Sequence, residues 1–86
     1  MNEIEARLTL ARHLASYHSR SYAYLATAAF LGRIDRVAVG KYQITVKASW
    51  KNAPEGEVRV VGSISDGSKR ITEEFNVMPI GEFAAL

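Results

Sequence analysis

The chain has 86 residues, no cysteine and a formal net charge of +2 at pH 7. This length is enough for one hydrophobic core and too short for two, so we expect a single domain over residues 1–86. Hydrophobic residues make up 48% of the chain and charged residues 23%, a balance typical of folded proteins. The lack of cysteine excludes disulfides, thiol nucleophiles and thiolate metal ligands.

The distribution of charge argues against a membrane protein. The longest uncharged run, residues 21–32, is well short of the roughly 20 apolar residues that cross a bilayer. Charged residues such as Glu3, Glu5 and Arg7 precede that run, which is unlike a secretory signal. We therefore expect a cytoplasmic protein that does not associate with membranes.

Residues 2–31 are predicted to form one long helix. Neither proline nor glycine interrupts this stretch, Asn2 is a suitable N-cap, and Gly32 is a natural end. If the helix bends, residues 19–21 are the expected place. The helix should pack on a sheet formed by the rest of the chain.

The predicted helix carries two apolar stripes. We assign the first to the sheet; it comprises Ile4, Leu8, Ala11, Ala15, His18, Tyr22, Leu25 and Ala29. The second has the spacing of a helix–helix seam and comprises Leu10, Leu14, Tyr17, Ser21, Tyr24, Ala28 and Leu31. One sheet cannot cover both stripes, so the second predicts a homodimer in which two helices pair.

After Asp35 the apolar period changes from 3.6 to 2, which predicts a strand over residues 36–51 with a bulge at Gly40. A turn over residues 52–56 should lead to a second strand, 57–65. The predicted pairs are Trp50 with Val58, Ala48 with Val60, Val46 with Gly62, and Ile44 with Ile64. A slip of one residue would turn polar side chains to the core, so this register is well specified.

A third strand is predicted over residues 69–78, after a two-residue turn at Asp66 and Gly67. This turn would place Glu74 opposite Arg59, and would direct Glu73 to the core face. Residues 79–86 form an apolar tail that should pack on the domain. The predicted fold class is α+β, with one long N-terminal helix on a three- to four-stranded antiparallel β-meander.

The leading functional hypothesis is a non-enzymatic binding or adaptor module that acts as a homodimer and can also bind another protein. An alternative is a small-ligand binder or minimal enzyme with a pocket between helix and sheet, lined by His18, Tyr22, Trp50 and Glu73. His13 and His18 lie too far apart around a helix to share a metal ion, and no cofactor motif is present.

A third hypothesis concerns the outer face of the predicted sheet. Four basic residues lie there: Lys47, Lys51, Arg59 and Arg70. They could bind a nucleic acid or an acidic protein, because clustered cations attract phosphates and carboxylates. That face has no aromatic side chains on which bases would stack, which is a reason against single-stranded nucleic acid.

Overall fold

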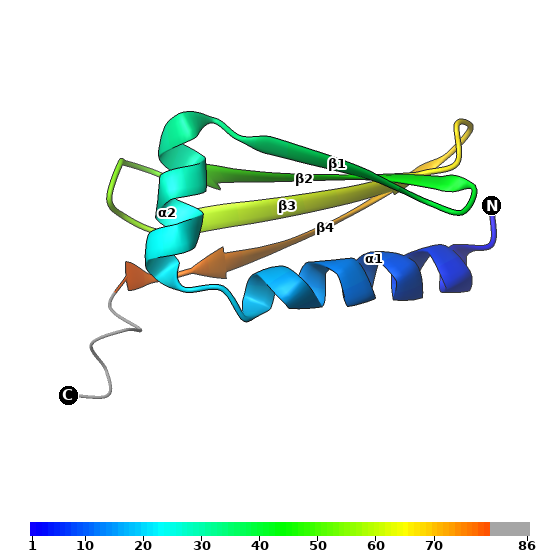
Figure 1. Cartoon of the computed structure of the whole chain (residues 1–86), viewed down its shortest axis with the longest axis horizontal. Helices are drawn as coiled ribbons and strands as arrows, with labels where there is room; N and C mark the ends of the chain where they lie inside the picture. Colours follow the sequence, from blue (N-terminus) through cyan, green and yellow to red (C-terminus); the bar gives the residue numbers. More distant parts are fainter. Residues whose placement is uncertain (80–86) are drawn as a thin grey trace.

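The computed structural model describes residues 1–79 and shows two helices followed by a four-stranded sheet (Figure 1). The elements are α1 (Glu3–His18), α2 (Tyr22–Leu31), β1 (Ile34–Val39), β2 (Tyr42–Trp50), β3 (Val58–Ser65) and β4 (Arg70–Val77). All neighbouring strands are antiparallel and follow chain order, β1-β2-β3-β4. The predicted α+β class and antiparallel meander are confirmed. The tail predicted from residue 79 onward lies, apart from Pro79, outside the described residues.

The helix predicted over residues 2–31 is divided into two helices, which corrects the prediction of one continuous helix. Ser21 has an extended backbone, with φ −70° and ψ 159°, and its side chain accepts a hydrogen bond from the Tyr24 backbone N–H. A serine that caps a new helix in this way satisfies a backbone donor and favours a break over continuation. As a result α1 runs along the strands, whereas α2 crosses them (Figure 1).

The break lets each helix turn its own face to the sheet. In α2 the predicted stripe is correct, because Leu25 and Ala29 are buried. In α1 the same stripe is wrong, because Ile4 and Leu8 are 75% and 53% exposed. The buried residues of α1 are Ala6, Leu10 and Leu14, which recur every four residues. Leu10 and Leu14 were assigned to the dimer seam, and instead they fill the core of their own chain.

The strand predicted over residues 36–51 is two strands joined by a two-residue turn. Val39 pairs with Tyr42, and Gly40 between them has φ +58°, a conformation that glycine adopts without steric cost. The predicted bulge at Gly40 is therefore wrong. Val37 and Val39 belong to a separate edge strand, β1, which lies beside β2.

The register between β2 and β3 is confirmed for all four predicted pairs. Between β3 and β4 it is shifted by two residues, because the loop is longer than the predicted two-residue turn and Ser65 pairs with Arg70. The Asp66 carboxylate accepts hydrogen bonds from the backbone N–H groups of Ser68 and Lys69, at 2.9 and 3.0 Å, which stabilises this longer loop.

A shift of two residues keeps every side chain of β4 on its predicted face. Ile71 is buried and Glu73 lies opposite Gly62 on the face that carries the helices. Arg59 is opposite Asn76 rather than Glu74, although its guanidinium still forms an ion pair with Glu74 at 3.2 Å. The predicted attraction between Arg59 and Glu74 is therefore present as a diagonal contact.

A glycine in β3 sets how closely α1 approaches the sheet. A Cβ atom added at Gly62 would lie 2.7 Å from Cδ2 of Leu14 and 3.1 Å from its Cγ. Leu14 is only 5% exposed, so it has little space into which it can move. The missing side chain at position 62 therefore makes room for α1.

We predict that Gly62→Ala destabilises the protein. Overpacking of a core costs about 1–3 kcal/mol, and the reduced entropy of the unfolded chain returns about 0.4–1 kcal/mol, so the expected net loss of stability is about 1 kcal/mol. Urea unfolding of Gly62→Ala, Leu14→Val and the double variant measures the interaction free energy between positions 62 and 14. The penalty of Gly62→Ala should shrink in the Leu14→Val background, which lacks the Cδ atoms; equal penalties in both backgrounds would contradict the close contact.

Candidate functional site

The structure separates the four residues of the predicted ligand pocket. The imidazole of His18, at the end of α1, stacks on the ring of Phe75 with 3.7 Å between ring centroids. Glu73 accepts a hydrogen bond from the Arg7 guanidinium at 2.8 Å. His18 and Glu73 line the same groove between α1 and β4, about 450 Å³ in volume, but each has a different partner. The predicted His–Glu hydrogen-bonded pair is not formed within residues 1–79.

The other two members of that predicted pocket lie elsewhere. The Tyr22 hydroxyl donates a hydrogen bond to the Gly56 carbonyl at 2.7 Å. Tyr22 and His18 line a second hollow of about 410 Å³ near the end of β4. Trp50 packs against the core from the end of β2 and lines neither hollow. His18 therefore shares one hollow with Glu73 and another with Tyr22, and the four residues do not enclose a common pocket.

The predicted dimer seam does not form a continuous surface. Leu10 and Leu14 are 0% and 5% exposed, so they cannot contact a second chain. Ser21 caps α2, and the remaining members range from partly buried Tyr17, Tyr24 and Ala28 to exposed Leu31. Because the helix is broken between α1 and α2, the two halves of the predicted seam face different directions. A helix–helix seam over these seven residues is therefore excluded.

The basic face exists, but two of its four cations are paired with acids. Lys51 lies 3.7 Å from the Glu57 carboxylate, and Arg59 lies 3.2 Å from that of Glu74. Lys47 and Arg70 form no ion pair within residues 1–79. The positive charge that is free to attract an anion is thus smaller than the sequence implied, and it is unevenly distributed.

Two surfaces were missed by the sequence analysis. One is the open edge of β1 with its exposed valines, Val37 and Val39. The other is a polar cleft of about 400 Å³ on the face of the sheet away from the helices, near the loop at Asp66 and Gly67. The sequence feature that could have indicated the separate edge strand β1 is Val-Gly-Lys-Tyr at residues 39–42, which suits a tight hairpin turn as well as a bulge.

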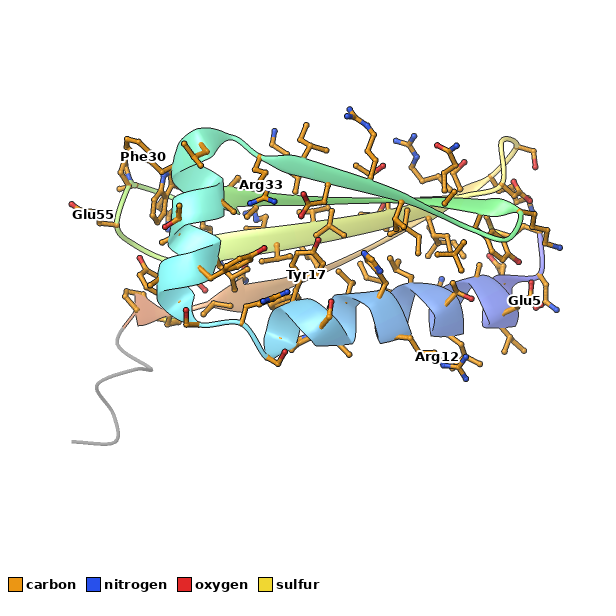
Figure 2. All side chains as sticks on the ribbon, viewed as in Figure 1. Glu5, Arg12, Tyr17, Phe30, Arg33 and Glu55 are labelled. Carbon is orange, nitrogen blue, oxygen red and sulfur yellow. The ribbon has the colours of Figure 1, made fainter. Side chains whose placement is uncertain are left out.

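Two tyrosines join the helices to the sheet through carboxylates. The Tyr17 hydroxyl donates to Asp35 at 2.8 Å, and Tyr17 lies at the C-terminal end of α1, facing the sheet (Figure 2). Burial first, and then this hydrogen bond, raise the pKa of Tyr17 from 10.0 to about 12. The Tyr42 hydroxyl donates to Glu5 at 2.5 Å, and this bond is the largest cause that raises the pKa of Tyr42 to about 12.

The pKa shifts of Tyr17, Tyr42 and Asp66 keep these three residues in their ordinary charge states near neutral pH. Both tyrosines remain protonated, and hydrogen bonds from the Lys69 and Ser68 backbone amides and the Ser68 hydroxyl hold the pKa of Asp66 far below its usual value. Each of these shifts moves the pKa away from neutrality, which is opposite to what a general acid or base at pH 7 requires. Within residues 1–79, no three His, Asp or Glu side chains come together to hold a metal ion.

Comparison with known protein families, curated proteins and solved structures found no match for this chain. In the described part of the chain, no helix is both long and apolar enough to cross a membrane. The function therefore has to be argued from the surfaces of this molecule.

We predict that stability falls as the pH rises from 10 toward 12. In this range the folded chain keeps the phenolic protons of Tyr17 and Tyr42, whereas the unfolded chain loses them at its ordinary pKa of 10.0. Proton release then favours unfolding, so the stabilisation is complete below pH 10 and is lost through pH 12. Urea unfolding at several pH values should show a shallower decline for Tyr17→Phe/Tyr42→Phe than for the native chain; parallel declines would contradict the assignment.

Proposed function

We propose that the protein is a non-enzymatic binding module that acts as a homodimer, and that the two copies associate through the open edge of β1. The observation that carries the proposal is the position of the exposed apolar side chains. Five of the eight large hydrophobic residues exposed within residues 1–79 fall in one stretch: Phe30, Leu31, Ile34, Val37 and Val39. The helices leave this stretch uncovered.

The stretch covers the end of α2 and the whole of β1. Phe30 is 78% exposed at the C-terminal end of α2 (Figure 2). Val37 and Val39 lie on the helix-bearing face of the sheet, opposite Ile44 and Tyr42, yet they remain 39% and 40% exposed. Ile34 lies opposite Lys47 on the other face, so the β1 edge carries exposed apolar side chains on both faces. Exposed apolar side chains that are grouped typically mark an interaction surface, whereas isolated ones do not.

The backbone of β1 is also open to another strand. β1 is an edge of the sheet, and within residues 34–39 there is no proline, lysine or bulge that would block pairing. The residues that flank a two-residue hairpin turn, here Val39 and Tyr42, form a hydrogen-bonded pair. From there, hydrogen-bonded and non-hydrogen-bonded pairs alternate along β1 and β2. The backbone groups of Ile34, Arg36 and Ala38 therefore face the open side.

Charge disfavours two antiparallel registers for two copies of β1, and the exposed valines favour a third. Pairing centred on Arg36 would place two guanidinium groups opposite each other, and pairing centred on Asp35 would place two carboxylates opposite each other. Both arrangements are destabilising. Centring the pair on Val37 sets Arg36 opposite the partner's Ala38 and Asp35 opposite the partner's Val39. This register buries apolar surface on the helix side and joins the two sheets into one.

We predict that the native chain is a dimer at micromolar concentration and that Val37→Arg weakens association at least about tenfold, equivalent to 1.4 kcal/mol. Ile4→Arg is the matched control, because Ile4 is an exposed apolar residue of α1 outside the stretch. Native mass spectrometry across a dilution series measures both variants. A monomeric native chain, or equal effects of the two substitutions, would overturn the proposed interface.

The register has a sharper test, because the chain contains no cysteine of its own. Residues opposite each other at a non-hydrogen-bonded position have Cα atoms about 4.5 Å apart, within disulfide range. Val37→Cys should therefore form a disulfide-linked dimer under mild oxidation. Val39→Cys is the control: it is equally exposed on the same face, but in this register it lies four positions from its own copy. Efficient cross-linking through position 39 instead would contradict the register.

A further inference from the structure

The face of the sheet opposite the helices carries a polar cleft at the end where the two hairpin loops meet. The strand registers place Gln43, Ser65 and Arg70 in one row across the sheet. Thr45, Ser63 and Thr72 form the next row. The N-terminus, the β1–β2 turn and the β3–β4 loop all lie at this end of the molecule (Figure 1).

The lining of the cleft combines short and long side chains. Thr45, Ser63 and Ser65 contribute short hydroxyl side chains, and Lys41 and Arg70 contribute long ones. Gly67 adds no side chain to the rim. The volume of the cleft, about 400 Å³, falls within the range of small-molecule sites, although the cleft is open to solvent on one side. Nearly every lining side chain ends in a hydroxyl, an amide or a charge.

The charges of the cleft favour an anion. Arg70 forms no ion pair within residues 1–79, so its guanidinium is free to bind. The one carboxylate of the lining, Asp66, is occupied: it accepts hydrogen bonds from the Ser68 and Lys69 amides and lies 3.5 Å from the N-terminal ammonium. Lys41 also lines the cleft, but its ammonium lies 3.9 Å from the Glu5 carboxylate and 5.5 Å from the centroid of the Tyr42 ring, so Arg70 is the main cation of the site.

The lining also limits what the anion can be. No aromatic side chain lines the cleft, so it has no surface on which a base would stack. Arginine binds tetrahedral oxyanions with two parallel N–H donors, and hydroxyl and amide side chains suit the hydroxyl groups of a sugar. A single cleft of this size fits one small molecule rather than an extended strand.

From this arrangement we infer that the cleft binds a small phosphorylated sugar, with Arg70 on the phosphate and Gln43, Thr45 and Ser63 on the sugar hydroxyls. The site lies on the face opposite the helices and is complete within one chain. It is therefore independent of the proposed dimer, and a failure of either idea leaves the other standing.

Nuclear magnetic resonance of the ¹⁵N-labelled full chain tests the site. Glucose 6-phosphate is added at constant ionic strength, with inorganic phosphate and glucose in separate titrations. We expect saturable shifts of the amides of Gln43, Ser65, Gly67 and Arg70, and tighter binding of glucose 6-phosphate than of inorganic phosphate. Arg70→Gln should weaken that binding at least about tenfold, a change equivalent to 1.4 kcal/mol.

Lys47→Gln is the matched control, because Lys47 is an ion-pair-free cation on the same face that does not line the cleft. Its affinity for glucose 6-phosphate should equal that of the native chain. Thr45→Val, which keeps the shape of the side chain, should weaken glucose 6-phosphate binding and leave inorganic phosphate unaffected. Equal losses in Arg70→Gln and Lys47→Gln, or shifts that track ionic strength alone, would overturn the site. Tighter binding of a single-stranded oligonucleotide, weakened equally by both substitutions, would overturn it in favour of nucleic acid.

Discussion

The contact between Leu14 and Gly62 fixes where α1 lies, and the two exposed surfaces follow from that position. A side chain at residue 62 would force α1 away from β3, because the Cβ atom would overlap the Leu14 methyl groups. With α1 held over β3 and β4, and α2 over β2 and β3, the helical layer covers three strands of the sheet. Apart from the hydrogen bond between Tyr17 and Asp35, the two helices leave the fourth strand largely uncovered. β1 is left with its valines partly exposed.

The exposure of β1 is therefore a consequence of packing geometry as well as of composition. Val37 and Val39 would be ordinary core residues if a longer or differently placed helix covered them. The hydrogen bond between Tyr17 and Asp35 joins the C-terminal end of α1 to β1, but Val37 and Val39 remain partly exposed. A sheet edge with open backbone groups and apolar side chains is a template for pairing with another strand, which is the physical reason for proposing a second chain there.

The sequence predicts the sheet better than the helices, and the reason is periodicity. Alternation along residues 42–50 and 58–65 fixes the register, because a slip of one residue would expose the whole core face. On a helix, a modest rotation about the helix axis exchanges one apolar stripe for the other. Helix propensity does not depend on that rotation, so it does not indicate which stripe is buried. Residues 19–21 are a predicted place for a bend, but Ser21 acts as the N-cap of a separate helix. Because α1 is no longer continuous with α2, it can turn a different stripe of side chains toward the sheet.

The site residues were harder to predict because their roles depend on distances that no local pattern encodes. His18 and Glu73 line the same groove, as their positions in the sequence suggested. However, His18 stacks on Phe75, and Glu73 accepts a hydrogen bond from Arg7. The shift of two residues at the Asp66 loop preserved every face yet changed which residues are neighbours across β3 and β4. Arg70 thereby moved into the row of Gln43 and Ser65, a placement on which the polar cleft depends.

The two faces of the sheet are linked at the end of the molecule that holds the N-terminus. Asp66 bonds its own loop and lies near the N-terminal ammonium, while Glu5 in the first turn of α1 accepts a hydrogen bond from Tyr42 and faces Lys41. The start of α1 therefore holds both loops that border the polar cleft, although the helix lies on the opposite face. Core packing that positions α1 therefore also helps to position these loops, and hydrogen bonds between the Ser63 and Thr72 hydroxyls and from the Gly67 amide to the Ser65 hydroxyl add contacts on the outer face.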